Sequence, residues 1–249
     1  NYSVDVVAFR KISPVANFKL YPSIDDHHSS DGYHNPGIEV FRGAVANWFQ
    51  QGADGVHAFN FNYASNEPYG GQDWQSHLQF YKECGRPETI ERKHKTFVLQ
   101  RRGGGHGPTV IPNPEDWSTP RYWFNNSNML APLPALLDHE GKVDTLLSLE
   151  VGDDVNALVD QIDQISLKML LSDPAAASHP DAERIAQAVV SVGARPGGIL
   201  HNEPPAQGIE RITELRINNI LLEPPIIEDG WLLFRNVSQN WPKSISQNP

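Results

Sequence analysis

Residues capable of chemistry gather directly after two apolar runs of the chain. Asp25 and Asp26 follow the first run, which ends at Ile24. A polar loop follows the second run, Gly55–Phe61. A carboxyl group can donate or accept a proton, an amide can hydrogen-bond a hydroxyl group, and an aromatic ring can stack on a ligand. The other candidates share the end of that second run and its loop: Asn60, Asn62, Tyr63, Glu67, Tyr69, Asp73 and Trp74.

Each group of candidates also has a purely structural interpretation. Two aspartates after a strand often start a loop or cap a helix, and the asparagines can satisfy backbone groups at a strand end. His27 and His28 beside two acids suggest a metal, but no HExxH or comparable spacing supports one. We therefore predict neither a metal nor a cofactor.

Three short apolar segments are expected to hold these residues in place. The segments are Val4–Phe9, Phe18–Ile24 and Gly55–Phe61, and each is typical of a buried parallel strand. Arg10 directly follows the first of them. We expect them to lie side by side and parallel, with their polar ends opening onto one hollow. His57, in the middle of the third segment, is expected to be a packed core histidine.

A helix is predicted between the second and third segments. Ile38, Phe41, Val45 and Trp48 recur at helical spacing, and Phe49 joins the same apolar face. Gly52 is expected to close the helix as a C-terminal cap. The order of strand, helix, glycine and strand is typical of an α/β fold.

Further elements follow before the chain changes character. We expect a helix over Gln75–Glu83, a helical turn opened by Pro87, a strand over Thr96–Leu99 and a glycine- and proline-rich connector to Pro120. After about residue 128 the chain predicts an antiparallel β-sandwich, with Asn218–Asn219 and Glu228–Gly230 as turns and an insertion at about 173–207. The strand candidates there are Thr145–Val151, Ile165–Leu171, Arg211–Ile217 and Trp231–Phe234.

Composition narrows the classes of partner. The chain has 249 residues, 39% of them hydrophobic, and a formal net charge of −10. That charge disfavours nucleic acid and anionic membranes, and no apolar stretch is long enough to span a bilayer. Cys84 is the single cysteine, so no internal disulfide can form, and we do not expect it to be a nucleophile.

Three stretches resemble the family-ten-like glycosyl hydrolases of bacteria. Ile38–Tyr63, with the sequence IEVFRGAVANWFQQGADGVHAFNFNY, is similar to a helix-and-strand segment of that family. Cys84–Leu99 resembles the segment that follows it. Asn218–Leu222 together with Glu228–Trp231 resembles a signature of the family's terminal sandwich.

The resemblance implies a partial TIM-type (β/α) barrel over residues 1–127, followed by a C-terminal β-sandwich domain over 128–249. A complete barrel of this type needs about 250 residues. We therefore expect that the N-terminal half of the barrel is absent and that a further segment completes it. Only eight residues separate Phe9 from Phe18, too few for a crossover helix, so either that helix is missing or Val4–Phe9 is not a strand.

The resemblance also implies activity on carbohydrate. Glycoside hydrolysis uses two carboxyl groups, and we expect Asp25 and Glu67 to be catalytic. The substrate-binding candidates are then Asp26, Asn60, Asn62, Tyr63, Tyr69 and Trp74, in a secreted or periplasmic protein. A non-catalytic glycan-binding or cell-surface protein, or a fragment of a larger enzyme, are the alternatives.

Overall fold

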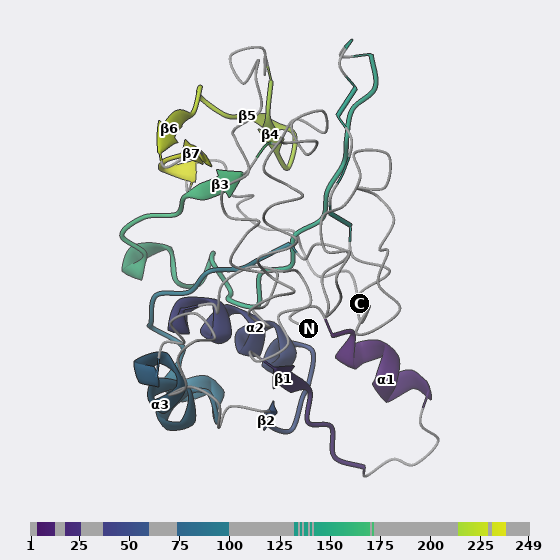
Figure 1. Cartoon of the computed structure of the whole chain (residues 1–249), viewed down its shortest axis with the longest axis vertical. Helices are drawn as coiled ribbons and strands as arrows, with labels where there is room; N and C mark the ends of the chain where they lie inside the picture. Colours follow the sequence, from purple (N-terminus) through teal and green to yellow (C-terminus); the bar gives the residue numbers. More distant parts are fainter. Residues whose placement is uncertain are drawn as a thin grey trace, which may run out of the picture. The chain divides into compact units, whose positions relative to one another are not determined.

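The computed structural model describes the chain in several stretches. They are residues 4–12, 18–25, 37–59, 74–99, 132–133, 135, 137–138, 140, 142–169, 171, 214–228 and 231–237. The described residues divide into two compact units, the first reaching Asp153 and the second beginning at Asp154 (Figure 1). The predicted domain boundary at 127/128 and the predicted insertion at 173–207 lie outside the described residues.

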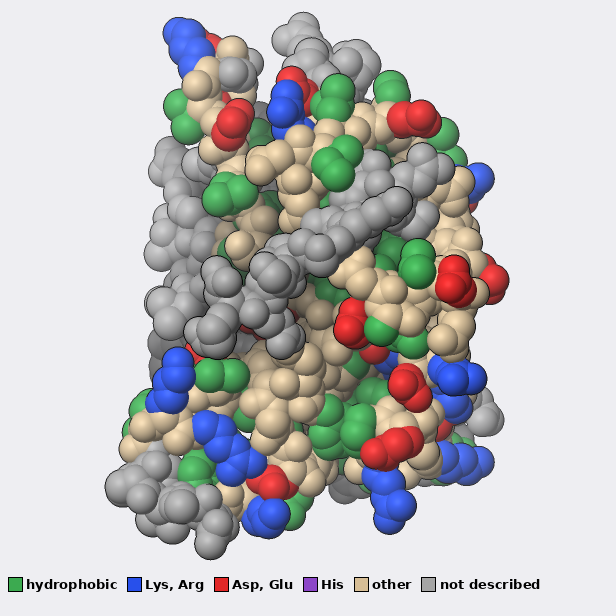
Figure 2. Space-filling model, turned by 180° about the vertical axis from the view of Figure 1, so that it is seen from behind, with side chains coloured by type: hydrophobic (Ala, Val, Ile, Leu, Met, Phe, Trp, Pro, Cys, Tyr) green, Lys and Arg blue, Asp and Glu red, His purple; other side chains and the backbone are tan. Residues whose placement is uncertain are grey.

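The described surface mixes charges of both signs. On the face seen in Figure 2, acidic and basic side chains are interspersed with hydrophobic ones. No helix in the described part of the chain combines the length and apolar character that crossing a bilayer requires.

A β–α–β unit forms the centre of the first unit. It consists of β1 (Ser23–Asp25), α2 (Ile38–Gln50) and β2 (His57–Phe59), and β1 pairs with β2 in parallel (Figure 1). The register sets Ser23 opposite His57, and Asp25 opposite Phe59. The predicted parallel pairing of these two segments is confirmed, although both strands are shorter than predicted.

Helix α2 forms as its sequence predicts. Phe41, Val45 and Trp48 are each fully buried, and Phe49 packs against the same core from a partly buried position. The helix ends where Gly52 adopts a left-handed φ of 91°. The Gly52 N–H donates to the Phe49 carbonyl at 2.9 Å, and the N–H of the following Ala53 donates to the Trp48 carbonyl at 2.9 Å. This bonding pattern is a Schellman motif, so the predicted glycine cap is confirmed.

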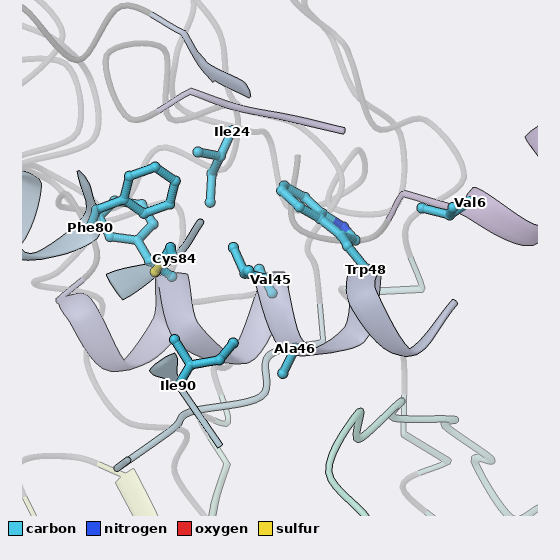
Figure 3. Close-up of a cluster of buried hydrophobic side chains, with 10 residues drawn as sticks. Val6, Ile24, Val45, Ala46, Trp48, Phe80, Cys84 and Ile90 are labelled. Carbon is cyan, nitrogen blue, oxygen red and sulfur yellow. The ribbon is translucent and has the colours of Figure 1, made fainter. Parts of the chain in front are cut away.

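Helix α3 (Trp74–Glu83) packs against α2, and both contribute to the core of the first unit. Figure 3 shows Val45 and Trp48 pointing from α2 toward Ile24 of β1, with Phe80 on α3 and Cys84 directly after it. The rings of Phe41 and Phe80 meet edge to face at 5.5 Å between centroids. Each fully buried side chain of this size contributes about 1.5–3 kcal/mol. The predicted helix over Gln75–Glu83 is confirmed, and the helical turn predicted at Pro87 is the 3-10 helix η2 (Pro87–Thr89).

The first predicted strand is wrong, because Val4–Phe9 contributes to a helix instead. Helix α1 spans Val6–Ile12. The carboxylate of Asp5 accepts a hydrogen bond from the Ala8 N–H at 2.8 Å, which caps the helix, and Arg10 and Lys11 complement the dipole in its last turn. This cap and these charges outweigh the strand preference of the valines, and no crossover helix is then needed before β1.

Two other predicted strands, Thr96–Leu99 and Thr145–Val151, are not strands in the structure. The Thr96 N–H instead donates to the Glu39 carbonyl of α2 at 2.8 Å. In the second segment, the Glu150 carbonyl accepts a hydrogen bond from the Asn47 side chain at 3.2 Å. Both segments therefore bond to helix α2 rather than to a neighbouring strand.

The second unit contains the 3-10 helix η4 (Val159–Gln161) and antiparallel strands. Strands β3 (Leu167–Met169), β7 (Trp231–Phe234) and β6 (Ile226–Glu228) form one sheet in that order. The strand predictions at Ile165–Leu171 and Trp231–Phe234 are confirmed within these bounds.

A tight hairpin accompanies this sheet. It joins β4 (Arg216–Ile217) to β5 (Ile220–Leu221) through Asn218 and Asn219. Both asparagines have positive φ, 50° and 66°, as a type I′ turn requires. The turn predicted at these two residues is confirmed.

Candidate functional site

The structure describes two of the predicted site residues. Asp25 is the last residue of β1, and Trp74 is the first residue of α3. The remaining predicted site residues lie outside the described residues: Asp26, Asn60, Asn62, Tyr63, Glu67 and Tyr69.

The carboxyl edge of the β1–β2 pair lies at the chain positions after which most of the predicted site residues follow in the sequence. Because the two strands are parallel, both end at the same edge, with Asp25 paired to Phe59. In the sequence, Asn60 directly follows Phe59, and residues 60–73 connect this edge to the start of α3. The segments that follow Asp25 and Phe59 in the sequence therefore both start at one edge of one sheet.

Arg10 is not a strand-end residue, as the sequence suggested, but a clamp that extends from α1. Its guanidinium donates to the carbonyls of Phe18 and Gly52, both at 2.8 Å, and forms an ion pair with Asp54. It also lies 5.2 Å from the centroid of the Phe18 ring, within the range of a cation–π contact. One side chain thus joins α1, the approach to β1 and the end of α2.

Asp54 is the acceptor at the centre of this clamp. Its carboxylate also accepts from the Leu20 N–H at 2.9 Å and from Lys19 Nζ at 2.9 Å. The backbone hydrogen bond from Leu20, with those from Lys19 and Arg10, holds the pKa of Asp54 well below its ordinary value. The clamp therefore holds the approaches to β1 and β2 side by side.

A serine–histidine pair lies at the start of β1 and β2, at the opposite end of the strands from the carboxyl edge. The sequence interpretation missed this pair. Ser23 Oγ is 3.0 Å from His57 Nδ1, and both side chains are exposed. His57 is therefore not the packed core histidine that its sequence predicts. The alternation within β2 turns Ala58 toward the core and leaves His57 and Phe59 on the open face. The pair is no Ser–His–Asp arrangement within the described residues, since no carboxylate there bonds to the other ring nitrogen.

A second ionic cluster lies between α2 and α3, and its central Arg42–Glu83 pair is buried. Glu83 accepts from Arg42 Nε at 2.8 Å, Lys93 Nζ at 2.7 Å and Gln79 Nε2 at 3.0 Å. Burial raises the pKa of Glu83, but the hydrogen bonds outweigh burial and lower it to about 2. The Arg42 and Glu83 side chains are 9% and 10% exposed, so this cluster belongs to the core rather than to a site.

Cys84 is buried directly after the end of α3. Burial, followed by the charge of Glu83, raises the pKa of the Cys84 thiol to about 12, which favours the protonated thiol over the reactive thiolate. Within the described stretches, no three His, Cys, Asp or Glu side chains come together in a way that could hold a metal ion. His27 and His28 lie outside those stretches.

Comparison with known proteins yields no relative. No family model, curated protein or solved structure matches the chain.

Proposed function

We propose that this chain is a glycoside hydrolase-like protein that acts on a polysaccharide or oligosaccharide by carboxylate acid–base catalysis. Asp25 is the first catalytic group of the proposal and Glu67 the second. One protonates the leaving oxygen, and the other attacks the anomeric carbon or activates water. Asp26, Asn60, Asn62, Tyr63, Tyr69 and Trp74 are the proposed substrate-binding residues, and the protein is proposed to be exported to reach its carbohydrate.

One observation supports the proposal most. Asp25 ends β1 opposite Phe59, the residue after which the polar loop of candidates begins. Ligands of parallel α/β sheets bind beyond the carboxyl ends of the strands, where neighbouring strands bring their following loops together. An antiparallel pairing of these strands would have separated Asp25 from that loop, and the parallel pairing brings their starting points to one edge.

Hydrolysis of a panel of soluble oligosaccharides and polysaccharides tests the proposal with the full chain. Asp25→Asn and Glu67→Gln should each lower the rate at least about a hundredfold, because each removes a proton-transfer or nucleophilic group. Glu88→Gln is the matched control, since Glu88 is an exposed carboxylate on η2. Hydrolysis that persists in both site variants would show that the catalytic residues lie elsewhere. Saturable binding without turnover by the unmodified chain would identify a glycan-binding protein instead.

A further inference from the structure

One face of the β1–β2 sheet packs on α2, and the opposite face is open. Ile24 is fully buried and Ala58 packs against the same core, whereas Ser23, His57 and Phe59 are exposed. Figure 3 shows the Ile24 side chain pointing from β1 toward α2. Because side chains alternate along a strand, the exposed residues share the face turned away from the helix.

Tyr21 extends this open face toward the start of the strands. Its side chain is 55% exposed, and its ring lies over Gly55, where an added Cβ would be only 2.7 Å from Tyr21 Cε1. At the other end the rings of His57 and Phe59 have centroids 6.3 Å apart. The open face, defined by Tyr21, Ser23, His57 and Phe59, thus carries two aromatic side chains with a polar pair between them.

The polar pair is arranged to present one nitrogen to a ligand. The hydrogen bond with Ser23 occupies His57 Nδ1 and fixes the ring. Nε2 makes no hydrogen bond in the described structure, so it is left to donate or accept according to the tautomer. The interior of a closed parallel barrel is packed mostly with bulky branched side chains. Ser23 and His57 are not side chains of this kind, so this face does not have the composition of a packed barrel interior.

The chemistry of the open face favours a neutral ligand with both apolar and hydroxyl surfaces. The charge of Lys19, two residues before Tyr21, is compensated by Asp54 at 2.9 Å. A pyranose ring offers a C–H face to an aromatic ring and hydroxyl groups to an imidazole nitrogen. The open face also leads directly to Asp25 and Phe59 at the carboxyl edge.

We infer that Tyr21, Ser23, His57 and Phe59 form a sugar-binding subsite beside the proposed catalytic edge. His57 Nε2 hydrogen-bonds a sugar hydroxyl, Phe59 and Tyr21 contact the C–H face, and Ser23 positions the His57 ring. The inference rests on the proposed function for its ligand class, but it concerns binding and does not require turnover.

Binding to the full chain tests the inference separately from catalysis. The probes are hexasaccharides of glucose, xylose, mannose and N-acetylglucosamine, titrated by calorimetry against the Asp25→Asn variant so that turnover does not interfere. His57→Ala and Phe59→Ala should each weaken the best-bound hexasaccharide roughly tenfold, since each removes a hydrogen bond or a stacking surface. Phe9→Ala is the matched control, because Phe9 is 54% exposed on α1 and Phe59 is 47% exposed. Its affinity should equal that of the parent.

The Ser23 variants separate a positioning role from a merely structural one. Ser23→Ala should weaken binding a few-fold, and Ser23→Thr, which keeps the hydroxyl group, should restore it. The ring resonances of His57 should shift on saturation with sugar in the parent. Circular dichroism of every variant checks that its fold is retained.

The outcomes distinguish this inference from the proposed function. Binding that depends on His57 and Phe59, together with no hydrolysis by the unmodified chain, would support the subsite and overturn the catalytic proposal. Hydrolysis that requires Asp25 but has an unchanged KM in His57→Ala and Phe59→Ala would overturn the subsite alone. Failure of every hexasaccharide to bind would also overturn it.

Discussion

The two ends of helix α2 are held by ionic clusters of similar design but different exposure. Near its start, Arg42 and Glu83 form a buried pair, 9% and 10% exposed, and Lys93, 40% exposed, bonds to the same carboxylate. Beyond its end, Asp54 pairs with Arg10 and Lys19, and the Lys19 side chain is 67% exposed. Each carboxylate accepts at least three hydrogen bonds, so the difference between the clusters lies in the surrounding medium.

That difference determines what each cluster contributes. Removing one member of a buried pair leaves an uncompensated charge in a poorly hydrated place, whereas water and salt compensate a broken exposed pair. The buried cluster should therefore control the stability of the first unit. The exposed one should control how α1 and the approach to β1 are aligned with α2.

The largest effect is expected from Glu83→Gln. The substitution leaves the buried Arg42 guanidinium without its anion, so we expect the free energy of unfolding to fall by about 3 kcal/mol. Urea unfolding followed by circular dichroism measures it. Replacing both partners, as in Arg42→Met with Glu83→Leu, should recover much of the loss, because no charge is then stranded. A double variant as unstable as Glu83→Gln would show that packing, rather than charge, explains the effect.

A tight backbone contact near the same end of α2 gives the next effect. A Cβ at Gly43 would lie 2.2 Å from the Thr96 carbonyl oxygen, so Gly43→Ala must push helix and segment apart. We expect a loss of about 2 kcal/mol in the free energy of unfolding, measured by the same urea method. Gly85→Ala is the control, since nothing lies within 4 Å of its added Cβ. Equal stability of the two variants would contradict the close approach.

The sequence predicts the elements of this region better than their contacts. The spacing of Phe41, Val45 and Trp48 identifies α2, and Gly52 identifies its end, because both signals are local. Thr96–Leu99 has strand-like residues but pairs with no strand among the described residues, and its Thr96 N–H bonds to α2 instead. Whether Thr96–Leu99 forms a strand depends on which segment lies beside it in the folded chain. A local sequence pattern does not encode that neighbour.

The candidate site divides in the same way. Placing Asp25 at a strand end requires only the apolar run before it, and the structure has Asp25 there. Pairing Ser23 with His57 requires the register between segments 34 residues apart, so the sequence interpretation missed it. Likewise the valines of Val4–Phe9 favour a strand, whereas the cap at Asp5 favours the helix that the structure shows.

The difference in the free energy of unfolding between the unmodified chain and Glu83→Gln should decrease at acid pH. The Glu83 pKa is lowered from 4.5 to about 2 in the folded state, so its contribution is complete above pH 4.5 and is lost as the pH falls toward 2. Between pH 5 and pH 3 the stability gap between the two chains should shrink by an amount on the order of 1 kcal/mol. Urea midpoints measured at both pH values check this. A constant gap would mean that Glu83 has the same pKa in the folded and unfolded chains.

The smallest effect on stability is expected from Asp54→Asn at the exposed cluster. Because water reaches the cluster, the urea midpoint should fall by less than in Glu83→Gln. The difference in urea midpoint between Asp54→Asn and the unmodified chain should decrease further in 1 M NaCl. The substitution should act on alignment instead: amide hydrogen exchange at Leu20 should accelerate, because its N–H donates to Asp54 at 2.9 Å. Glu88→Gln, with its exposed carboxylate on η2, is the control and should change neither quantity. A destabilisation by Asp54→Asn as large as that by Glu83→Gln, and insensitive to salt, would show that exposure does not distinguish the two ends of α2.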